Sequence, residues 1–130
     1  MPDVTADTLA EYTQLAVTLT PLSAINLLNI RASIGCSLST ASNINMLLMI
    51  VKSGTDAVKK TAAFANYAAT LMMQTGTVTH AELTGGTSSQ TWKIYYGPGV
   101  AATMYVNSMS GNSRYGNTQQ SFHVIEELMV

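Results

Sequence analysis

Hydrophobic and polar residues alternate along much of the chain, as in strands that have one buried and one exposed face. Over residues 12–20, Leu15, Val17 and Leu19 fall on one face, and Pro21 ends the segment. A longer alternation over residues 26–37 places these apolar residues on one face: Leu28, Ile30, Ala32, Ile34 and Cys36. Both segments are therefore predicted to be strands, with Asn29, Arg31, Ser33 and Ser37 on the opposite face of the second.

Residues 40–74 are harder to assign, because they are rich in Met, Leu and Ala and propensity alone would allow one or two helices. The apolar run 45–52 is followed by Ser53-Gly54-Thr55-Asp56, whose glycine can supply the positive φ of a turn. This run is predicted to be a strand that enters a turn. Residues 61–74 fit neither the helical nor the strand period and stay undecided on their own pattern.

Strand patterns return in the second half of the chain, over residues 76–83, 91–96, 103–107 and 121–130. Turn-forming residues separate them at 84–89 and 97–99, and a long loop is predicted over 108–119. Trp92, Ile94 and Tyr96 should share one packed strand face. Many short strands at this spacing predict an all-β sandwich or barrel.

Length and composition limit the possible functions. The 130 residues, 47% of them hydrophobic, fit one domain, predicted over 12–130 after a polar leader or stalk junction at 1–11. A net charge of −1 with 10% charged residues gives no basic field for nucleic acid. No apolar run suits a membrane span, and the N-terminus lacks a signal-peptide pattern, so we expect synthesis in the cytoplasm and no membrane insertion.

Reactive side chains are few. Cys36 is the only cysteine, which excludes an intrachain disulfide, and we expect its thiol to be buried. His80 and His123 have no neighbouring carboxylates or thiols at metal-ligand spacing, so we expect both on strand surfaces, with no metal and no cofactor.

Catalytic groups are not predicted either. A glycan-cleaving enzyme, one alternative function, would need paired carboxylates facing a cleft. Glu82, Glu126 and Glu127 are the only acidic residues of the C-terminal half, and the last two should point to opposite faces of a strand. The chain is therefore expected not to be an enzyme.

Several segments resemble a family of phage structural jelly rolls. Residues 88–94 (SSQTWKI), 103–107 (TMYVN) and 121–128 (SFHVIEEL) are similar to the closing strands of that family, which read like SSQTYKV, TVYVN and STITVMEI. Residues 15–24 (LAVTLTPLSA) and 47–55 (LLMIVKSGT) resemble its VSVTITPKSA corner and its central strand ending in R-G-T. The chain departs from the pattern in Lys52, in the pair Glu126-Glu127 and in a methionine-rich centre: Met46, Met49, Met72 and Met73.

The resemblance implies an antiparallel jelly-roll sandwich of about eight strands, strands in the ambiguous middle, and a homotrimer located in a virion. The expected function is a tail-fibre or spike tip that attaches to a host surface glycan or protein. The alternative is a capsid decoration or head-fibre protein that contacts only other virion proteins.

Loops on a rigid sandwich commonly carry recognition, so we expect a ligand surface at the loop 108–119, unless that loop is simply solvated. The candidate residues are Asn107, Asn112, Arg114, Tyr115 and Asn117.

Overall fold

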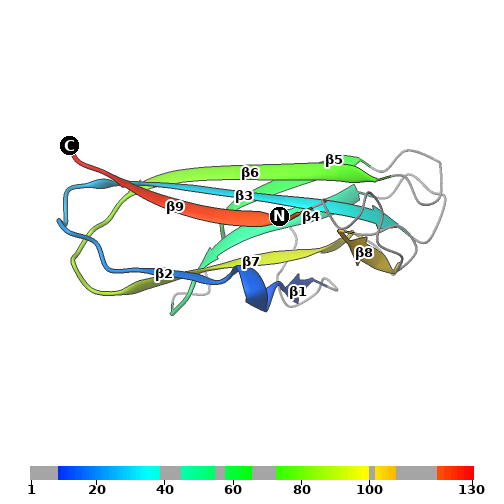
Figure 1. Ribbon diagram of the computed structural model, residues 1–130, viewed down its shortest axis with the longest axis horizontal. Helices are drawn as coiled ribbons and strands as arrows, with labels where there is room; N and C mark the ends of the chain where they lie inside the picture. The colour runs from blue at the N-terminus through cyan, green and yellow to red at the C-terminus, as the bar shows by residue number, and fades with distance from the viewer. Residues whose placement is uncertain (1–8, 39–44, 55–57, 66–72, 100–101, 108–119) are drawn as a thin grey trace.

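A computed structural model describes residues 9–38, 45–54, 58–65, 73–99, 102–107 and 120–130 (Figure 1). The described ranges contain nine strands and one 3₁₀ turn, and no α-helix. None of their helical segments could cross a membrane. In chain order the elements are β1 (Ala10–Glu11), η1 (Thr13–Leu15), β2 (Val17–Leu19), β3 (Leu27–Leu38), β4 (Asn45–Lys52), β5 (Val58–Ala65), β6 (Gln74–Leu83), β7 (Gln90–Pro98), β8 (Met104–Val106) and β9 (Phe122–Leu128).

The strands form two antiparallel sheets. In the first sheet the order is β7-β4-β5, and β1 and β2 lie end to end along the free side of β7. In the second sheet β3 lies between β6 on one side and both β9 and β8, again end to end, on the other. The strand pairs are nested along the chain. The pair β4–β5 lies inside the pair β3–β6, and that pair lies inside the pair β2–β7.

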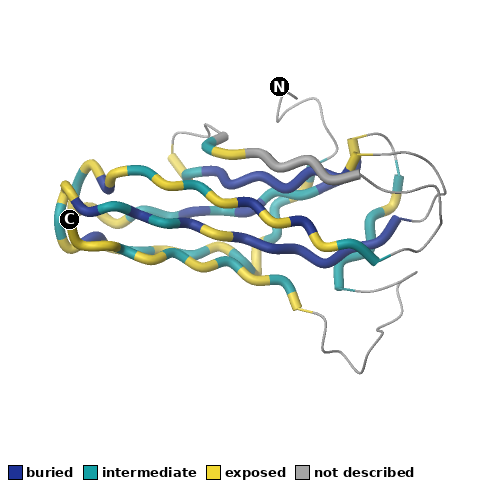
Figure 2. The backbone as a smooth tube through the Cα atoms, turned by 90° about the horizontal axis from the view of Figure 1, so that it is seen from above, coloured by how far each residue is buried: buried dark blue, intermediate teal, exposed yellow. Residues whose placement is uncertain are grey.

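The core lies between the inner faces of the two sheets. Its central cluster comes from β3, β4, β6 and β7 and consists of Leu28, Ile30, Ala32, Ile34, Leu48, Ile50, Val78, Trp92 and Ile94. Buried and exposed residues alternate over the first part of β6, and Figure 2 shows such changes of burial along the backbone. Burying these side chains supplies the main stabilisation, at about 1.5–3 kcal/mol for each large one.

The sequence predicted several of these elements correctly. Strands β3 and β4 match the predicted segments 26–37 and 45–52, and every apolar residue assigned to the buried face of β3 is at most 1% exposed. The turn after β4 has Gly54 at φ 88°, as expected. In the ambiguous middle, residues 58–65 form a strand, while residues 66–72 lie outside the described ranges.

Cys36 is fully buried, as predicted, and burial raises the pKa of its thiol to about 12. The Cys36 Sγ lies 3.4 Å from the Met46 Sδ in a small cluster with Leu38.

The predicted strand at 12–20 is wrong in its first half. A 3₁₀ turn interrupts it, in which the Leu15 amide donates to the Tyr12 carbonyl at 2.9 Å. Tyr12 itself is held by the Ile94 carbonyl, to which its amide donates at 2.8 Å, and by edge-on packing against the Tyr96 ring. The predicted break at 97–99 also starts too early, since β7 pairs with β4 as far as Pro98.

The outer face of β3 also differs from its prediction. Ser33 and Ser37 are 6% and 0% exposed, although the alternation placed them on the polar face. Ser33 accepts a hydrogen bond from the Thr77 hydroxyl at 3.3 Å, so hydrogen bonding offsets part of the cost of burying its hydroxyl.

Candidate functional site

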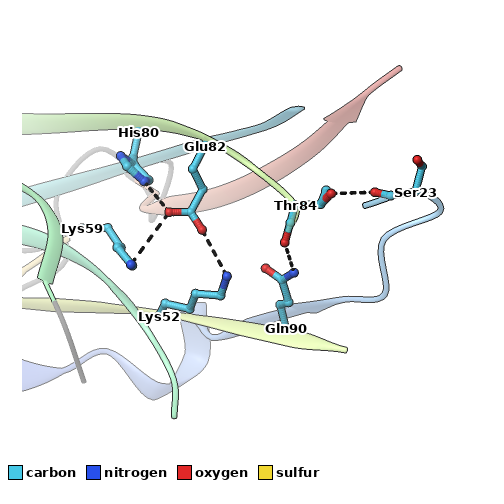
Figure 3. A network of polar contacts seen from close by, with 7 residues as sticks. All are labelled: Ser23, Lys52, Lys59, His80, Glu82, Thr84 and Gln90. Atoms are coloured by element: carbon cyan, nitrogen blue, oxygen red, sulfur yellow. Dashed lines mark hydrogen bonds and ion pairs between the residues drawn. The ribbon is translucent and has the colours of Figure 1, made fainter. Parts of the chain in front are cut away.

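A cluster of charged side chains links the two sheets near the end of β6 (Figure 3). His80 and Glu82 are two residues apart on β6, so both point to its inner face. The Glu82 carboxylate lies 3.1 Å from Lys52 Nζ at the end of β4 and 3.0 Å from His80 Nε2. Lys59 Nζ on β5 is 4.0 Å away. One carboxylate of the second sheet therefore binds two ammonium groups of the first.

The electrostatics of this cluster favour an ionised Glu82. Burial alone would raise its pKa, but the hydrogen bonds from His80 and Lys52 and the charges of Lys52 and Lys59 outweigh burial and lower it. The Lys52 ammonium also lies 5.2 Å from the centre of the Trp92 ring, within cation–π range. Lys52 is thereby held between the carboxylate and the indole.

The turn between β6 and β7 is fixed from several sides. The Thr84 hydroxyl donates to the Ser23 carbonyl at 2.6 Å, and the Thr84 amide donates to the Asn26 carbonyl at 2.9 Å. Gln90 Nε2 donates to the Thr84 carbonyl at 2.7 Å (Figure 3). Gly85 adopts φ 67°, which a glycine allows at little cost.

An open pocket of about 510 Å³ lies between this turn and the charged cluster. It is lined by Lys52, Glu82, Leu83, Thr84, Gly85, Gly86, Ser88 and Gln90. The pocket places the ammonium donor of Lys52 beside the carboxylate acceptor of Glu82, with the Ser88 side chain nearby. Hydroxyl groups donate and accept at once, so a polyhydroxylated ligand matches this combination.

Among the predicted ligand residues, the described ranges contain only Asn107. It adopts φ 53°, its amide donates to the Gly35 carbonyl at 2.7 Å, and its Oδ1 accepts from the Ser121 hydroxyl at 2.9 Å. These contacts join the two ends of the predicted loop. Asn112, Arg114, Tyr115 and Asn117 lie outside the described residues.

Asn107 and the pocket are not neighbours. Asn107 follows β8 and binds Gly35, whereas Glu82 pairs with Leu28, seven residues earlier on β3. At about 3.3 Å per residue, roughly 20 Å of strand separates them.

The prediction of surface histidines is wrong for both positions. His80 belongs to the charged cluster, and the Nδ1 of His123 lies 2.6 Å from the Leu15 carbonyl. Burial lowers the pKa of His123 despite this hydrogen bond. Over the ranges that the structure describes, no three His, Cys, Asp or Glu side chains are grouped as a metal site.

Glu126 and Glu127 point to opposite faces of β9, as predicted. Glu126 lies 3.2 Å from Arg31 on the outer face of the second sheet. Glu127 accepts from the amides of Leu22 and Ser23 and from Asn26 Nδ2, and these hydrogen bonds lower its pKa. Glu127 thus ties the corner before β3 to the last strand.

The C-terminus, the β2–β3 corner and the β6–β7 turn meet at one end of the sandwich (Figure 1), and these segments carry most of the large exposed hydrophobic side chains of the described residues. We call this the apolar end; its exposed members are Leu22, Ile25, Leu83, Leu128, Met129 and Val130, at 46–86% exposure. Leu27 pairs with both Leu83 and Leu128, which continues the row across the second sheet. Contiguous exposed apolar side chains of this kind mark interaction surfaces.

The charged cluster was missed at the sequence level, although one signal was present. Gly76 and Val78 set the inner face of β6, and continuing this alternation places His80 and Glu82 on the same face.

Comparison of the chain with family models and with curated proteins finds no match to either.

Proposed function

We propose that the chain is a structural module of a phage particle: a jelly roll, assembled as a homotrimer, that forms a tail-fibre or spike tip and attaches to a host surface glycan or protein. The observation that carries this proposal is the nested pairing of β4–β5, β3–β6 and β2–β7. A long hairpin rolled into two sheets gives this order, as jelly rolls of virion proteins do. The resemblance of the closing strands points to the same class.

Two polar features support attachment. The pocket beside the β6–β7 turn offers paired donors and acceptors to glycan hydroxyls, on a turn held by Thr84 and Gln90. At the loop base, Asn107 and Ser121 hold together the ends of the segment that carries Arg114 and Tyr115. Weak sites repeated in a trimer would bind through avidity.

Binding of the labelled protein to whole host cells tests attachment. The double variant R114A/Y115A should lose binding if the loop carries the receptor surface, and S88A should weaken binding if the pocket does. Thr20→Ala, an exposed position before Pro21, is the matched control and should bind normally. Full binding by both R114A/Y115A and S88A would refute attachment through these two surfaces.

The apolar end specifically favours a second function, decoration of a capsid or fibre through contact with another virion protein. Its six exposed apolar side chains offer a surface that another virion protein could cover. In this case the chain would bind purified particles and not cells.

The mass of the purified protein by light scattering separates the two arrangements. A mass near three times 13.8 kDa is expected for the trimeric tip. A clean monomer would contradict the trimer and favour a decoration protein that assembles only on the particle.

A further inference from the structure

Strand β9 forms one edge of the second sheet. Its backbone pairs with β3 from Leu27 to Ser33, and within the described residues its outer side pairs with no strand. Over the described residues, β2, β3 and β4 find their partners in β7, β6 and β5, and β9 has a neighbouring strand on one side only. Unpaired amides and carbonyls at a sheet edge can pair with a strand of another chain.

Glu126 and Glu127 give β9 part of the usual protection of such an edge, but other protective features are missing from it. The strand runs for seven residues in unbroken register with β3, and it contains no proline, no lysine and no bulge. On its outer face, Phe122, Val124 and Leu128 are 46%, 37% and 46% exposed. Over the described residues the edge is therefore unpaired and regular, and its outer face is apolar except at Glu126.

We propose that β9 pairs antiparallel with β9 of a second copy of the chain, about a twofold axis at Ile125. The order of side chains along β9 is the reason for choosing a second copy of the chain as the partner. In this register all seven residues pair, with Phe122 opposite Leu128 of the second copy at both ends and Ile125 opposite itself at the centre. His123 then faces Glu127 of the second copy, and apolar and polar pairs of this kind stabilise neighbouring strands.

The neighbouring registers are worse. Inner and outer faces match only when the register moves by an even number of residues. Placing the axis at Glu126 sets two carboxylates opposite each other, which is destabilising. Placing it at Val124 moves the partners of Glu127 and Leu128 out of β9, to Ser121 and Gln120 of the second copy, and loses the pairing of Phe122 with Leu128.

This contact goes beyond the proposed trimer and uses a different symmetry. A twofold contact is closed, so on its own it gives a dimer, and between trimers it gives a six-chain assembly. The second sheets of two copies would join into one continuous sheet.

Substitutions of Val124 test the proposal, because they affect the stability of a single chain and the association of two chains differently. Inside the chain Val124 pairs with Arg31, which already binds Glu126, so V124E should change the stability of the isolated protein little, whereas V124K should destabilise it. Across the proposed axis Val124 faces Glu126 of the second copy. There V124E sets like charges opposite each other twice, and V124K forms two opposite-charge pairs.

The assay is sedimentation equilibrium of the wild type and both variants over a range of protein concentrations. We expect the wild-type mass to rise with concentration, from one copy to two or from three copies to six, and V124E to associate at least about tenfold more weakly than V124K. Equal association of the two variants, or stronger association of V124E, would refute the proposal. A wild-type monomer would refute both the pairing of β9 and the proposed trimer. A trimer that associates no further would refute only the pairing of β9.

Discussion

Replacing Glu82 by glutamine tests whether the charged cluster holds the two sheets together. The substitution keeps the shape of the side chain and removes its charge, leaving Lys52, Lys59 and His80 without their shared carboxylate. These side chains are 18–29% exposed, between a surface ion pair, worth up to about 1 kcal/mol, and a buried one, whose disruption costs about 3–5 kcal/mol. We therefore expect E82Q to lower the free energy of unfolding by about 2 kcal/mol.

Urea unfolding at pH 7 measures this loss. With an m-value of about 2 kcal/mol/M for a chain of this size, the E82Q midpoint should fall by about 1 M. The matched control is E126Q, which removes the ion pair with Arg31, whose two side chains are 46% and 44% exposed. We expect E126Q to cost less than about 1 kcal/mol.

The pH dependence provides a second test of the same contact. Because the pKa of Glu82 is lower in the folded state than its ordinary value of 4.5, its contribution is complete above that value and disappears as the pH falls through the folded pKa. The difference between wild type and E82Q should therefore shrink in acid. A loss no larger than that of E126Q at pH 7, or a difference that persists in acid, would refute the reasoning.

Three further predictions follow from the backbone, the corner and the core. G54A should cost about 1 kcal/mol in thermal or urea unfolding, because Gly54 has φ 88°, and G86A should be nearly neutral, because a Cβ there meets no atom within 4 Å; equal losses would contradict this. E127Q should speed hydrogen exchange at the Leu22 amide, and its effect on stability should shrink as the pH falls from 4.5 through the lowered pKa of folded Glu127; an unchanged exchange rate would contradict this role of Glu127. Cys36 should react with a thiol reagent at pH 8 only after unfolding, because its thiol is buried and its pKa is about 12; rapid reaction of the folded protein would contradict this.

The sequence predicts β3 and β4 well because their burial is a local pattern. Every second residue of β3 from Leu28 onward is apolar and buried, so the period alone identifies the strand and its inner face. The 3₁₀ turn that follows Tyr12 could not be predicted from such a local alternation. It depends on the Ile94 carbonyl and the Tyr96 ring, more than eighty residues away, which override the local alternation.

The candidate site was hidden for the same reason. His80 and Glu82 carry polar side chains at the end of a strand, where the sequence favours a solvent-exposed position. Their partners Lys52 and Lys59 belong to the other sheet, and no spacing along the chain relates them to Glu82. The alternation that starts at Val78 predicts the face of β6 on which the side chains of His80 and Glu82 lie. Their contact with the lysines of the other sheet follows only from the packing of the two sheets.

The two flanks of the sandwich are held by different means, and this difference separates folding from association. At the flank of β5 and β6, Glu82 binds lysines of the opposite sheet, so that flank is closed within one chain. At the flank of β9, the described links to the segment before β3 run through the side chains of His123 and Glu127, and no strand within the described ranges pairs with the free backbone edge. E82Q should therefore destabilise the single chain without changing its assembly, whereas V124E should weaken assembly without destabilising the single chain. Observing both effects in either variant would mean that the two flanks are coupled through the core.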